Sequence, residues 1–284
     1  MAALLEVRDL TVAFPRAAAV KELSFTIDEG ETLAIVGESG SGKSLTALAL
    51  LRLLPRTATI TKGAILLDAR DLVTLTEREM RWLRGSDIAM IFQEPMTSLN
   101  PVLSIGQQIS EVNRLHEGLS HRAARARAIE LLDLVRIPEP ARRVDAFPHE
   151  LSGGQRQRVM IAIAVACRPR LLIADEPTTA LDVTIQSQIL DLLDQLRRDL
   201  SMSLLLITHD LGIVGQWADR VIVMYAGRKV EEALPDQLLG APVHPYTQGL
   251  LAASPRLHAE HHYKDGPLIE IPGSITSAAF ESGC

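Results

Sequence analysis

The 284-residue chain has few cysteines, no long apolar run and no excess of basic residues. Two cysteines, Cys167 and Cys284, cannot build a disulfide framework, and Cys167 in "VMIAIAVACRP" is expected to be a small buried side chain. The net charge of −6 argues against a dedicated nucleic-acid binder. No apolar run reaches the about 18 residues that cross a bilayer, and "MAALLEVRDL" meets charge too soon for a secretory signal. We therefore expect a soluble, cytoplasmic protein that reaches a membrane only through a partner.

What is present is an alternation of strand-like and helix-like patterns, which predicts a parallel α/β sheet. The segments "LLEVRDLTVAF" and "LSFTIDEG" alternate in polarity, as in a half-exposed antiparallel sheet. Denser apolar runs are typical of buried parallel strands, and they occur in "ETLAIVG", "DIAMIFQEP", "RLLIADEP" and "SLLLITHD". The segment "GAILLDARDL" predicts a strand and turn, and "VIVMYAGRKVEE" a closing hairpin.

Helical periodicity separates these strands. It predicts helices at 44–54, where Pro55 stops the pattern, and at 104–118, 120–135, about 154–167 and 184–200. The arginines of "HRAARARA" could form a basic patch, but interleaved apolar residues favour a solvated helix face. We expect one α/β domain over 1–240, with a helical subdomain inserted at about 96–166. Residues 241–284 are expected to be an extension, irregular and peripheral after Pro235.

The stretch "GESGSGKSL" fits the P-loop pattern, with a strand before it and a helix after it. Bare backbone at such a loop approaches phosphate oxygens closely, and its N–H groups and the helix N-terminus favour an anion. The lysine adds a point charge for the β- and γ-phosphates, and the serine after it is placed to bind Mg²⁺. A chance glycine-rich turn is the alternative. The expected ATP-binding residues are Gly37, Glu38, Ser39, Gly40, Ser41, Gly42, Lys43, Ser44 and Leu45.

Four polar side chains follow other predicted strands. Asp175 ends "LLIAD" and would hold Mg²⁺ through water, while Glu176 would orient or deprotonate an attacking water. A helix N-cap before Pro177 is the alternative for this pair. His209 follows "LLLIT", where it could position the water near the γ-phosphate, although a lone histidine is more often structural. Gln93 follows "MIF" and could sense metal or water.

A second anion cradle, "LSGGQ", lies on the helical insertion, far from the P-loop in sequence. It places Ser152, Gly153, Gly154 and Gln155 at the start of a predicted helix. Two phosphate-binding elements for one nucleotide suggest a site shared between two copies. A P-loop kinase or GTPase would not explain this stretch or His209.

With these motifs in order, nearly the whole chain resembles the ATP-binding subunits of ABC transporters. The resemblance implies a P-loop (RecA-like) core with an antiparallel β subdomain, an ATPase activity, and ATP with Mg²⁺ as ligands. It implies that "LSGGQ" acts in trans and that "ALD", ending at Asp182, is the D-loop. It also implies that Phe14 stacks on adenine, although the residue alone would more often be core. Ser44, Gln93 and Asp175 are the metal-site residues it implies.

The segments "FQEPMTSLNP" and "HPYTQGLLAASP" resemble the branch that serves peptide and nickel importers. This implies a peripheral protein at the cytoplasmic face of the bacterial inner membrane. Its implied partners are a second ATPase subunit, two permeases and an extracytoplasmic solute-binding protein, without nucleic acid. The "EPMTSLNP" region and the helices after it would form the groove for a permease coupling helix. Because one terminal cysteine cannot ligate a cluster, we expect no iron–sulfur cluster. A soluble ABC-type ATPase of DNA repair or translation is the rival.

Overall fold

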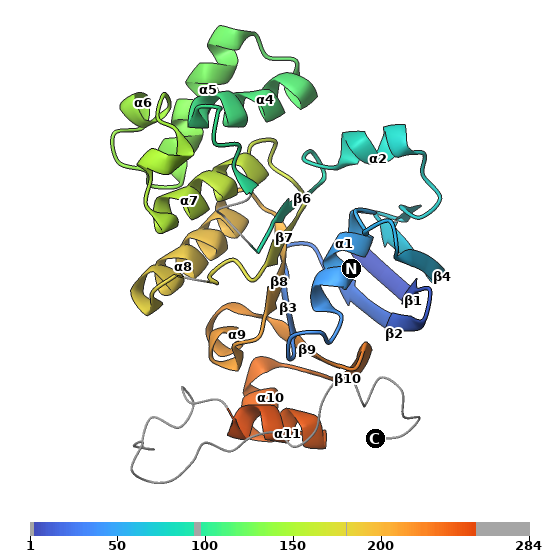
Figure 1. Cartoon of the computed structure of the whole chain (residues 1–284). Helices are drawn as coiled ribbons and strands as arrows, with labels where there is room; N and C mark the ends of the chain where they lie inside the picture. Colours follow the sequence, from blue (N-terminus) through green and yellow to red (C-terminus); the bar gives the residue numbers. More distant parts are fainter. Residues whose placement is uncertain (1–2, 94–97, 180, 254–284) are drawn as a thin grey trace. The chain divides into compact units, whose positions relative to one another are not determined.

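The computed structural model of the chain describes residues 3–93, 98–179 and 181–253 (Figure 1). The described residues fall into two compact units. Unit 1 holds those of Met1–Leu75 and Leu205–Cys284, and unit 2 holds those of Thr76–Leu204. Each unit contains strands and helices of its own.

One sheet of unit 1 is antiparallel, as the alternating sequence pattern predicts. Its strand order is β2-β1-β4-β5. Val7, Leu10 and Val12 of β1 are buried, whereas Arg8 and Asp9 between them are exposed, so one face of the strand covers the core. The strands are β1 (Leu5–Phe14), β2 (Ala17–Ile27), β4 (Thr59–Leu67) and β5 (Arg70–Asp71).

The second sheet of unit 1 carries the denser apolar strands. All five residues of β3 (Thr32–Val36) are buried, and β3 pairs in parallel with β9 (Arg220–Tyr225). The strand β10 (Arg228–Ala233) closes an antiparallel hairpin with β9. The strand β8 (Ser203–Thr208), most of which belongs to this unit, is the neighbour of β3 on its other side. The predicted buried strands and the closing hairpin are therefore confirmed.

The helices of unit 1 differ from the predictions at two places. Helix α1 (Lys43–Leu50) ends before Pro55 because Arg52 adopts a left-handed backbone (φ 52°). Within residues 235–253, which the structure describes, the segment is not irregular, so that prediction was wrong there. It forms α10 (Pro235–Gly240) and α11 (Pro245–Ala252), which follow α9 (Leu211–Trp217) in the chain.

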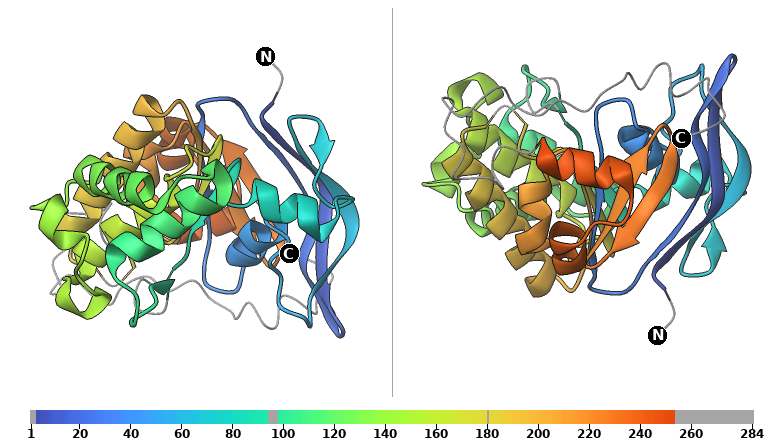
Figure 2. Two further views of the ribbon diagram at one scale, coloured as in Figure 1. Left: turned by 90° about the horizontal axis from the view of Figure 1, so that it is seen from above. Right: turned by 90° about the horizontal axis from the view of Figure 1, so that it is seen from below.

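The two C-terminal helices pack onto the core of unit 1. Figure 2 shows α10 and α11, in orange to red, beside β9 and β10. Leu238 and Tyr246 are buried in one apolar cluster with Val36 and Val223. Pro235 and Pro245 each occupy the first turn of a helix, where the missing N–H costs no intrahelical bond, so they begin helices instead of breaking them.

Unit 2 combines one pair of parallel strands with a set of helices. The strands β6 (Ile88–Ile91) and β7 (Leu171–Asp175) pair so that Ile91 lies opposite Ala174. Among the described residues, the helices are α2 (Glu77–Leu83), α4 (Ile105–Glu117), α5 (His121–Leu134), α6 (Pro140–Arg143), the 3₁₀ turn η1 (Pro148–Glu150), α7 (Gly153–Ala164) and α8 (Val183–Asp199). Sequence analysis missed α2, although Thr76 and Glu79 form a capping box at its start.

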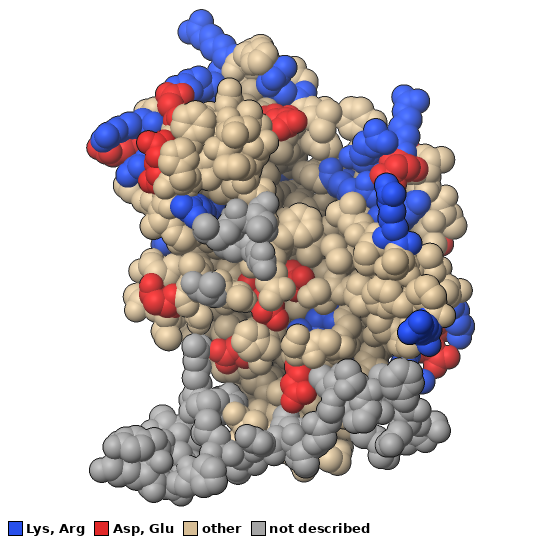
Figure 3. All heavy atoms as spheres, viewed as in Figure 1, with Lys and Arg blue, Asp and Glu red and all other residues tan. Residues whose placement is uncertain are grey.

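The arginines of "HRAARARA" lie on a solvated helix face, as expected. Ala124 and Ala128 turn the apolar side of α5 inward. On the other side the Arg125 guanidinium pairs with Asp145 at 2.6 Å, and that of Arg127 pairs with Glu130 at 2.9 Å. Figure 3 shows basic and acidic groups interspersed on the face in view. These arginines therefore sit among carboxylates that offset their charge.

Two further predictions concern burial and membrane spans. Cys167 was expected to be buried but is only half-buried. That partial burial is the main cause that raises the pKa of its thiol to about 11, so the thiol is protonated at neutral pH. No helix within the described residues is both long enough and apolar enough to cross a bilayer.

Candidate nucleotide-binding and hydrolysis site

The loop after β3 has a backbone that only glycine can adopt at two points. A Cβ on Gly37 would lie 2.2 Å from the carbonyl oxygen of Met224, and one on Gly42 would lie 2.8 Å from that of Ala19. Gly42 also has a left-handed φ of 103° and is the N-cap of α1. The two glycines therefore let the loop lie against β2 and β9 while it turns into the helix.

Lys43 occupies the inside of this loop. Its residue is only 4% exposed, and its Nζ donates hydrogen bonds to the carbonyl oxygens of Gly37 (2.7 Å) and Glu38 (2.9 Å). A buried ammonium needs such partners because its desolvation is costly. The loop thus fixes the lysine charge at the point where the helix begins.

The loop fits a polyphosphate. The Ser41 hydroxyl is fully buried and has no hydrogen-bond partner among the described residues. Buried polar groups are normally hydrogen-bonded, so a bound ligand could supply the missing partner. Ser39 and Gly40 are exposed at the tip of the loop, and Ser44 and Leu45 are half-buried in the first turn of α1. Backbone N–H groups, the helix N-terminus and Lys43 all favour an anion here.

Phe14 is the last residue of β1 and lies at the turn into β2. It pairs with Ala17 of β2. The carbonyl oxygen of Ala19, also in β2, lies against Gly42. The half-buried ring of Phe14 is therefore carried by the hairpin that touches the P-loop. Stacking on adenine stays a prediction.

In unit 2 the structure brings together two residues that were predicted from separate strands. The parallel pairing of β6 with β7 places Gln93 and Glu176 after adjacent strand ends. The Gln93 Nε2 donates to the Glu176 Oε2 at 3.0 Å. Asp175, the last residue of β7, is 4% exposed. A glutamine, a glutamate and an aspartate thus lie at one edge of this strand pair.

The Glu176 carboxylate has a second donor that sequence analysis missed. The Thr179 hydroxyl donates to the same Oε2 at 2.9 Å, and the Thr179 N–H bonds the Glu176 carbonyl at 3.1 Å. Glu176 itself has a left-handed backbone with φ 46°, which is uncommon for a residue other than glycine. The signal in the sequence was a hydroxyl three residues after the glutamate.

The N-cap alternative for the acidic pair does not hold in the structure. The helix after β7 is α8, and its N-cap is Asp182, whose carboxylate accepts from the Ile185 N–H at 2.9 Å. Asp182 therefore has a capping role in addition to the predicted D-loop role. Ala180 of the same motif lies outside the described residues.

The "LSGGQ" stretch forms the start of α7. Ser152 is the N-cap: its hydroxyl accepts from the Gln155 N–H at 3.3 Å, while the Gln155 side chain accepts from the Ser152 N–H at 3.1 Å. A Cβ on Gly154 would lie 3.0 Å from Ile185, so packing on α8 explains this glycine. On Gly153 a Cβ would meet nothing closer than Leu181 at 3.7 Å, so packing does not explain it. Bare, exposed backbone at a helix N-terminus suits an anion.

His209 follows β8 directly and is exposed. Its neighbours fix the local backbone, because the Thr208 hydroxyl accepts from the Asp210 N–H at 3.0 Å and Asp210 caps α9 at Gly212 (2.9 Å). Since β8 neighbours β3, His209 and Gly37 leave adjacent strands of unit 1. Its proposed contact with the γ-phosphate stays a prediction.

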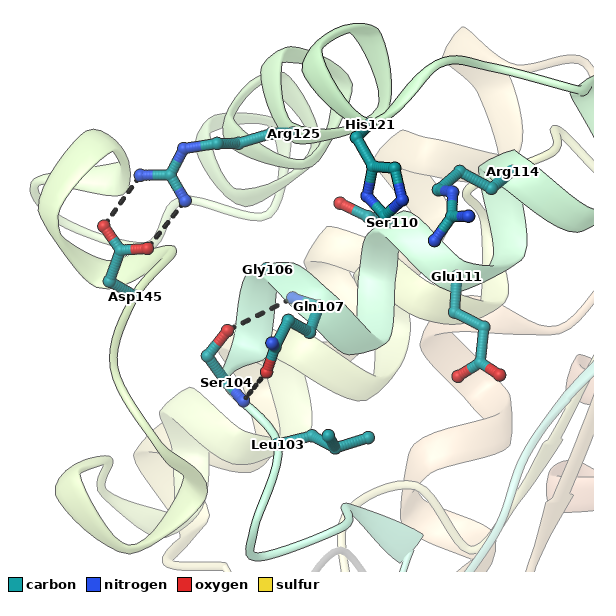
Figure 4. Close-up of a pocket in the computed structure, with 10 residues that line it drawn as sticks. All are labelled: Leu103, Ser104, Gly106, Gln107, Ser110, Glu111, Arg114, His121, Arg125 and Asp145. Carbon is teal, nitrogen blue, oxygen red and sulfur yellow. Dashed lines mark hydrogen bonds and ion pairs between the residues drawn. The ribbon is translucent and has the colours of Figure 1, made fainter.

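A separate hollow of about 590 Å³ lies on the helices of unit 2 (Figure 4). Its walls come from α4, from the start of α5 and from Asp145, which is bonded to Arg125. Glu111, Arg114 and His121 line the same hollow. It includes helices expected to form the groove for a partner, but residues 94–97 of that expected groove lie outside the described residues.

The fold and these loops define a P-loop nucleotide-binding protein. Residues 20–179 match the ABC transporter family, and residues 230–284 match the oligopeptide/dipeptide transporter C-terminal region. The chain belongs to the ABC transporter ATP-binding family, so it binds ATP and has the ABC ATPase fold. The predicted fold class and family are confirmed.

Known relatives agree with this family. The chain is 54% identical to the oligopeptide transport ATP-binding protein OppD of Bacillus subtilis over 95% of this chain and 76% of that protein. It is 57% identical to the glutathione import ATP-binding protein GsiA of Pectobacterium atrosepticum over 89% of this chain and 42% of that protein. A dimeric structure of the ATP-binding cassette MJ0796 with ADP and Pi has a TM-score of 0.72, with 29% identity, and covers 81% of this chain and 98% of that one.

The buried ammonium of Lys43 yields a direct test. Lys43→Ala removes the charge that we predict to lie nearest the phosphates of ATP, and a charge-assisted hydrogen bond contributes about 1.5–3 kcal/mol, or about 10- to 150-fold in Kd. A calorimetric titration with ATP should show this loss, whereas Lys62→Ala at an exposed lysine should leave the Kd unchanged. Unchanged ATP affinity in a folded Lys43→Ala chain would remove the lysine from the site.

Proposed function

We propose that the chain is the ATP-hydrolysing subunit of a bacterial importer that takes up peptides or a related small solute through partner permeases. The observation that carries this proposal is the Glu176 carboxylate, which Gln93 and Thr179 orient at the end of β7. The relatives support the transport role, because OppD and GsiA are named for oligopeptide transport and glutathione import. The proposed ATPase domain spans 1–240, with its helical subdomain at about 96–166 and a C-terminal extension at 241–284.

ATP would be bound by the loop from Gly37 to Leu45, with Phe14 on the base. The Ser44 hydroxyl and the Asp175 carboxylate are oxygen donors of the kind Mg²⁺ prefers. The metal, when bound, would neutralise charge on the phosphates. Lys43 would supply the protein's own charge for the β- and γ-phosphates.

Glu176 would accept the proton of the attacking water. Two donors on its Oε2 fix the direction of the carboxylate, which is what a general base needs before substrate arrives. Gln93, which contacts Glu176, would link metal or water to this base. His209 would hold the water near the γ-phosphate.

The signature would serve a second copy of the nucleotide-binding fold. Gly153 has no packing reason to be glycine, yet it sits exposed at the start of α7 beside Ser152. A helix N-terminus of this kind would bind the γ-phosphate held by the P-loop of the other subunit. That subunit would be an identical copy or a paralogue, and Asp182 would contribute from the D-loop.

A coupling helix of one permease subunit would dock on the helices of unit 2, in an assembly with two permease subunits. The hollow of Figure 4 offers a mixed set of charges, with Glu111 and Arg114 on its α4 wall and His121 on its α5 wall. A solute-binding protein outside the cell would deliver the solute, and the chain would lie peripherally at the cytoplasmic face of the inner membrane. The rival role in DNA repair or translation lacks support from the relatives, and no nucleic-acid partner is proposed. The expected absence of an iron–sulfur cluster rests on Cys284, outside the described residues.

Glu176→Gln tests the general base. The amide keeps the shape of the side chain but cannot take a proton, so ATP turnover in the assembled transporter should fall by about 10²- to 10⁴-fold. ATP affinity should not change, because the P-loop is untouched. The matched control is Glu130→Gln at an exposed ion pair, which should keep full turnover. Turnover of wild-type size in Glu176→Gln would eliminate the assigned role.

Ser152→Arg tests the shared site. The large cation would occupy the place where a small hydroxyl and bare backbone should meet phosphate, so ATP should bind as before but closure of the two subunits should fail. In a complex with a distinct partner subunit, nucleotide trapping should show turnover lost at the partner's P-loop.

The control for that variant is Ser120→Arg. Ser120 caps α5 through a hydrogen bond of the same length, 3.3 Å, so its replacement costs a comparable helix cap without touching the signature. It should leave turnover at both sites intact. If Ser152→Arg instead abolished hydrolysis only at the P-loop of its own chain, the shared-site proposal would be wrong.

A further inference from the structure

The C-terminal helix α11 contacts the P-loop through one hydroxyl group. The Tyr246 Oη accepts a hydrogen bond from the Glu38 backbone N–H at 3.0 Å, across 208 positions in the sequence. Both residues belong to unit 1, and Tyr246 is 7% exposed. The motif "HPY", which resembles the peptide-importer branch, therefore has a specific partner in the nucleotide-binding loop.

The start of α11 is fixed by hydrogen bonds of its own. Pro245 begins the helix, and the Nδ1 of His244 accepts from the Tyr246 N–H at 3.1 Å. The N–H groups of Val243 and His244 donate to the Glu231 carboxylate on β10 at 2.8 and 3.0 Å. Partial burial alone would raise the pKa of Glu231, but hydrogen bonds to its charged form hold that pKa below its usual value. These hydrogen bonds hold the first turn of α11, and with it Tyr246, in place.

The ring of Tyr246 packs against a second aromatic ring, that of Tyr225. Its centroid lies 4.4 Å from that of Tyr225, with an angle of 37° between the planes. Burial is the main cause that raises the pKa of Tyr246 to about 12, so its hydroxyl is neutral at physiological pH. A neutral phenol oxygen can accept the Glu38 N–H, and the packed ring holds that oxygen in place.

The Gly37–Glu38 peptide unit is held at both of its polar groups. Its carbonyl oxygen, on Gly37, accepts from the Lys43 Nζ, and its N–H, on Glu38, donates to Tyr246. Hydrogen bonds to both ends of one amide polarise it and strengthen each other. A second hydrogen bond joins the loop to the turn between β9 and β10, where the Gly227 N–H donates to the Ser41 carbonyl at 3.1 Å.

We propose that Tyr246 is a positioning residue for the P-loop: its hydroxyl orients the Gly37–Glu38 peptide, and through that peptide it sets the place of the Lys43 ammonium for phosphate binding. This inference rests on the proposed role of the loop in ATP binding. It gives the C-terminal region a part in the nucleotide site, since the residue comes from a helix inside the matched segment 230–284.

A purely structural role for Tyr246 makes a different prediction. If the residue only filled the core of unit 1, phenylalanine would serve as well, because it keeps the ring and its contact with Tyr225. What phenylalanine removes is the acceptor for the Glu38 N–H. The Glu38 N–H would then lack a hydrogen-bond partner. An amide without a partner favours another orientation of its peptide.

The test is a calorimetric titration of the full chain with ATP, comparing wild type with Tyr246→Phe. We expect the Kd to rise about three- to tenfold, the worth of one neutral hydrogen bond, with the stoichiometry of binding unchanged. A structural defect would do the reverse, because misfolded molecules lower the stoichiometry and leave the Kd of the folded ones alone. An unchanged Kd in Tyr246→Phe would overturn the proposal.

Two further variants keep the outcome unambiguous. Tyr225→Phe changes the other ring of the same pair but leaves the Tyr246–Glu38 hydrogen bond in place, so its Kd should equal that of wild type. Lys43→Ala reports on the proposed function itself. If Lys43→Ala loses ATP affinity and Tyr246→Phe does not, the positioning role fails alone; if neither loses affinity, the assignment of the loop fails.

Turnover gives an independent readout in the assembled transporter. A displaced phosphate cradle should raise the KM for ATP in Tyr246→Phe by a factor similar to that in Kd, while kcat stays near the wild-type value because Glu176 is unaffected. An equal loss in kcat with KM unchanged would contradict a role in positioning the loop.

Discussion

The hydrogen bonds of the Gly37–Glu38 peptide are the constraint on which the nucleotide site depends. The carbonyl oxygens of Gly37 and Glu38 hold a lysine that is nearly buried, and a buried ammonium is tolerated only where such partners stand ready. Because Gly37 lies against β9, no side chain can replace its hydrogen there. The sheet therefore determines the path of the loop, and the loop determines where the Lys43 charge would meet phosphate.

The candidate site residues of the two units differ in whether their polar groups already have hydrogen-bond partners. In unit 1 the P-loop leaves a buried hydroxyl, that of Ser41, for a ligand to satisfy. In unit 2 the Glu176 carboxylate is oriented in advance by Gln93 and Thr179. In the signature, Ser152 and Gln155 already hydrogen-bond each other in a capping box, so their polar groups are not open to a ligand. Phosphate binding there would have to exchange the bond of the Ser152 hydroxyl, which is long at 3.3 Å.

The sequence predicted whatever depends on local pattern. The P-loop, the acid at the end of β7 and the buried strands each follow from residues close together in the chain. Thr179 and Tyr246 were missed because their roles depend on geometry: the left-handed turn at Glu176 brings Thr179 back, and the folding of α11 onto unit 1 brings Tyr246 to Glu38. Pro235 and Pro245 led to the expectation of an irregular segment because a proline at the first position of a helix and a proline in a loop look alike in the sequence without the caps around them.

Helix α11 holds the Gly37–Glu38 peptide through the Tyr246 hydroxyl, and this contact does not need nucleotide. Residue-resolved amide hydrogen exchange, measured by NMR on the nucleotide-free chain, tests it most directly. The Glu38 amide should exchange slowly in wild type and at least about tenfold faster in Tyr246→Phe, since its acceptor is gone, while amides in β3 keep their rates. Equal exchange of Glu38 in the two proteins would contradict the account.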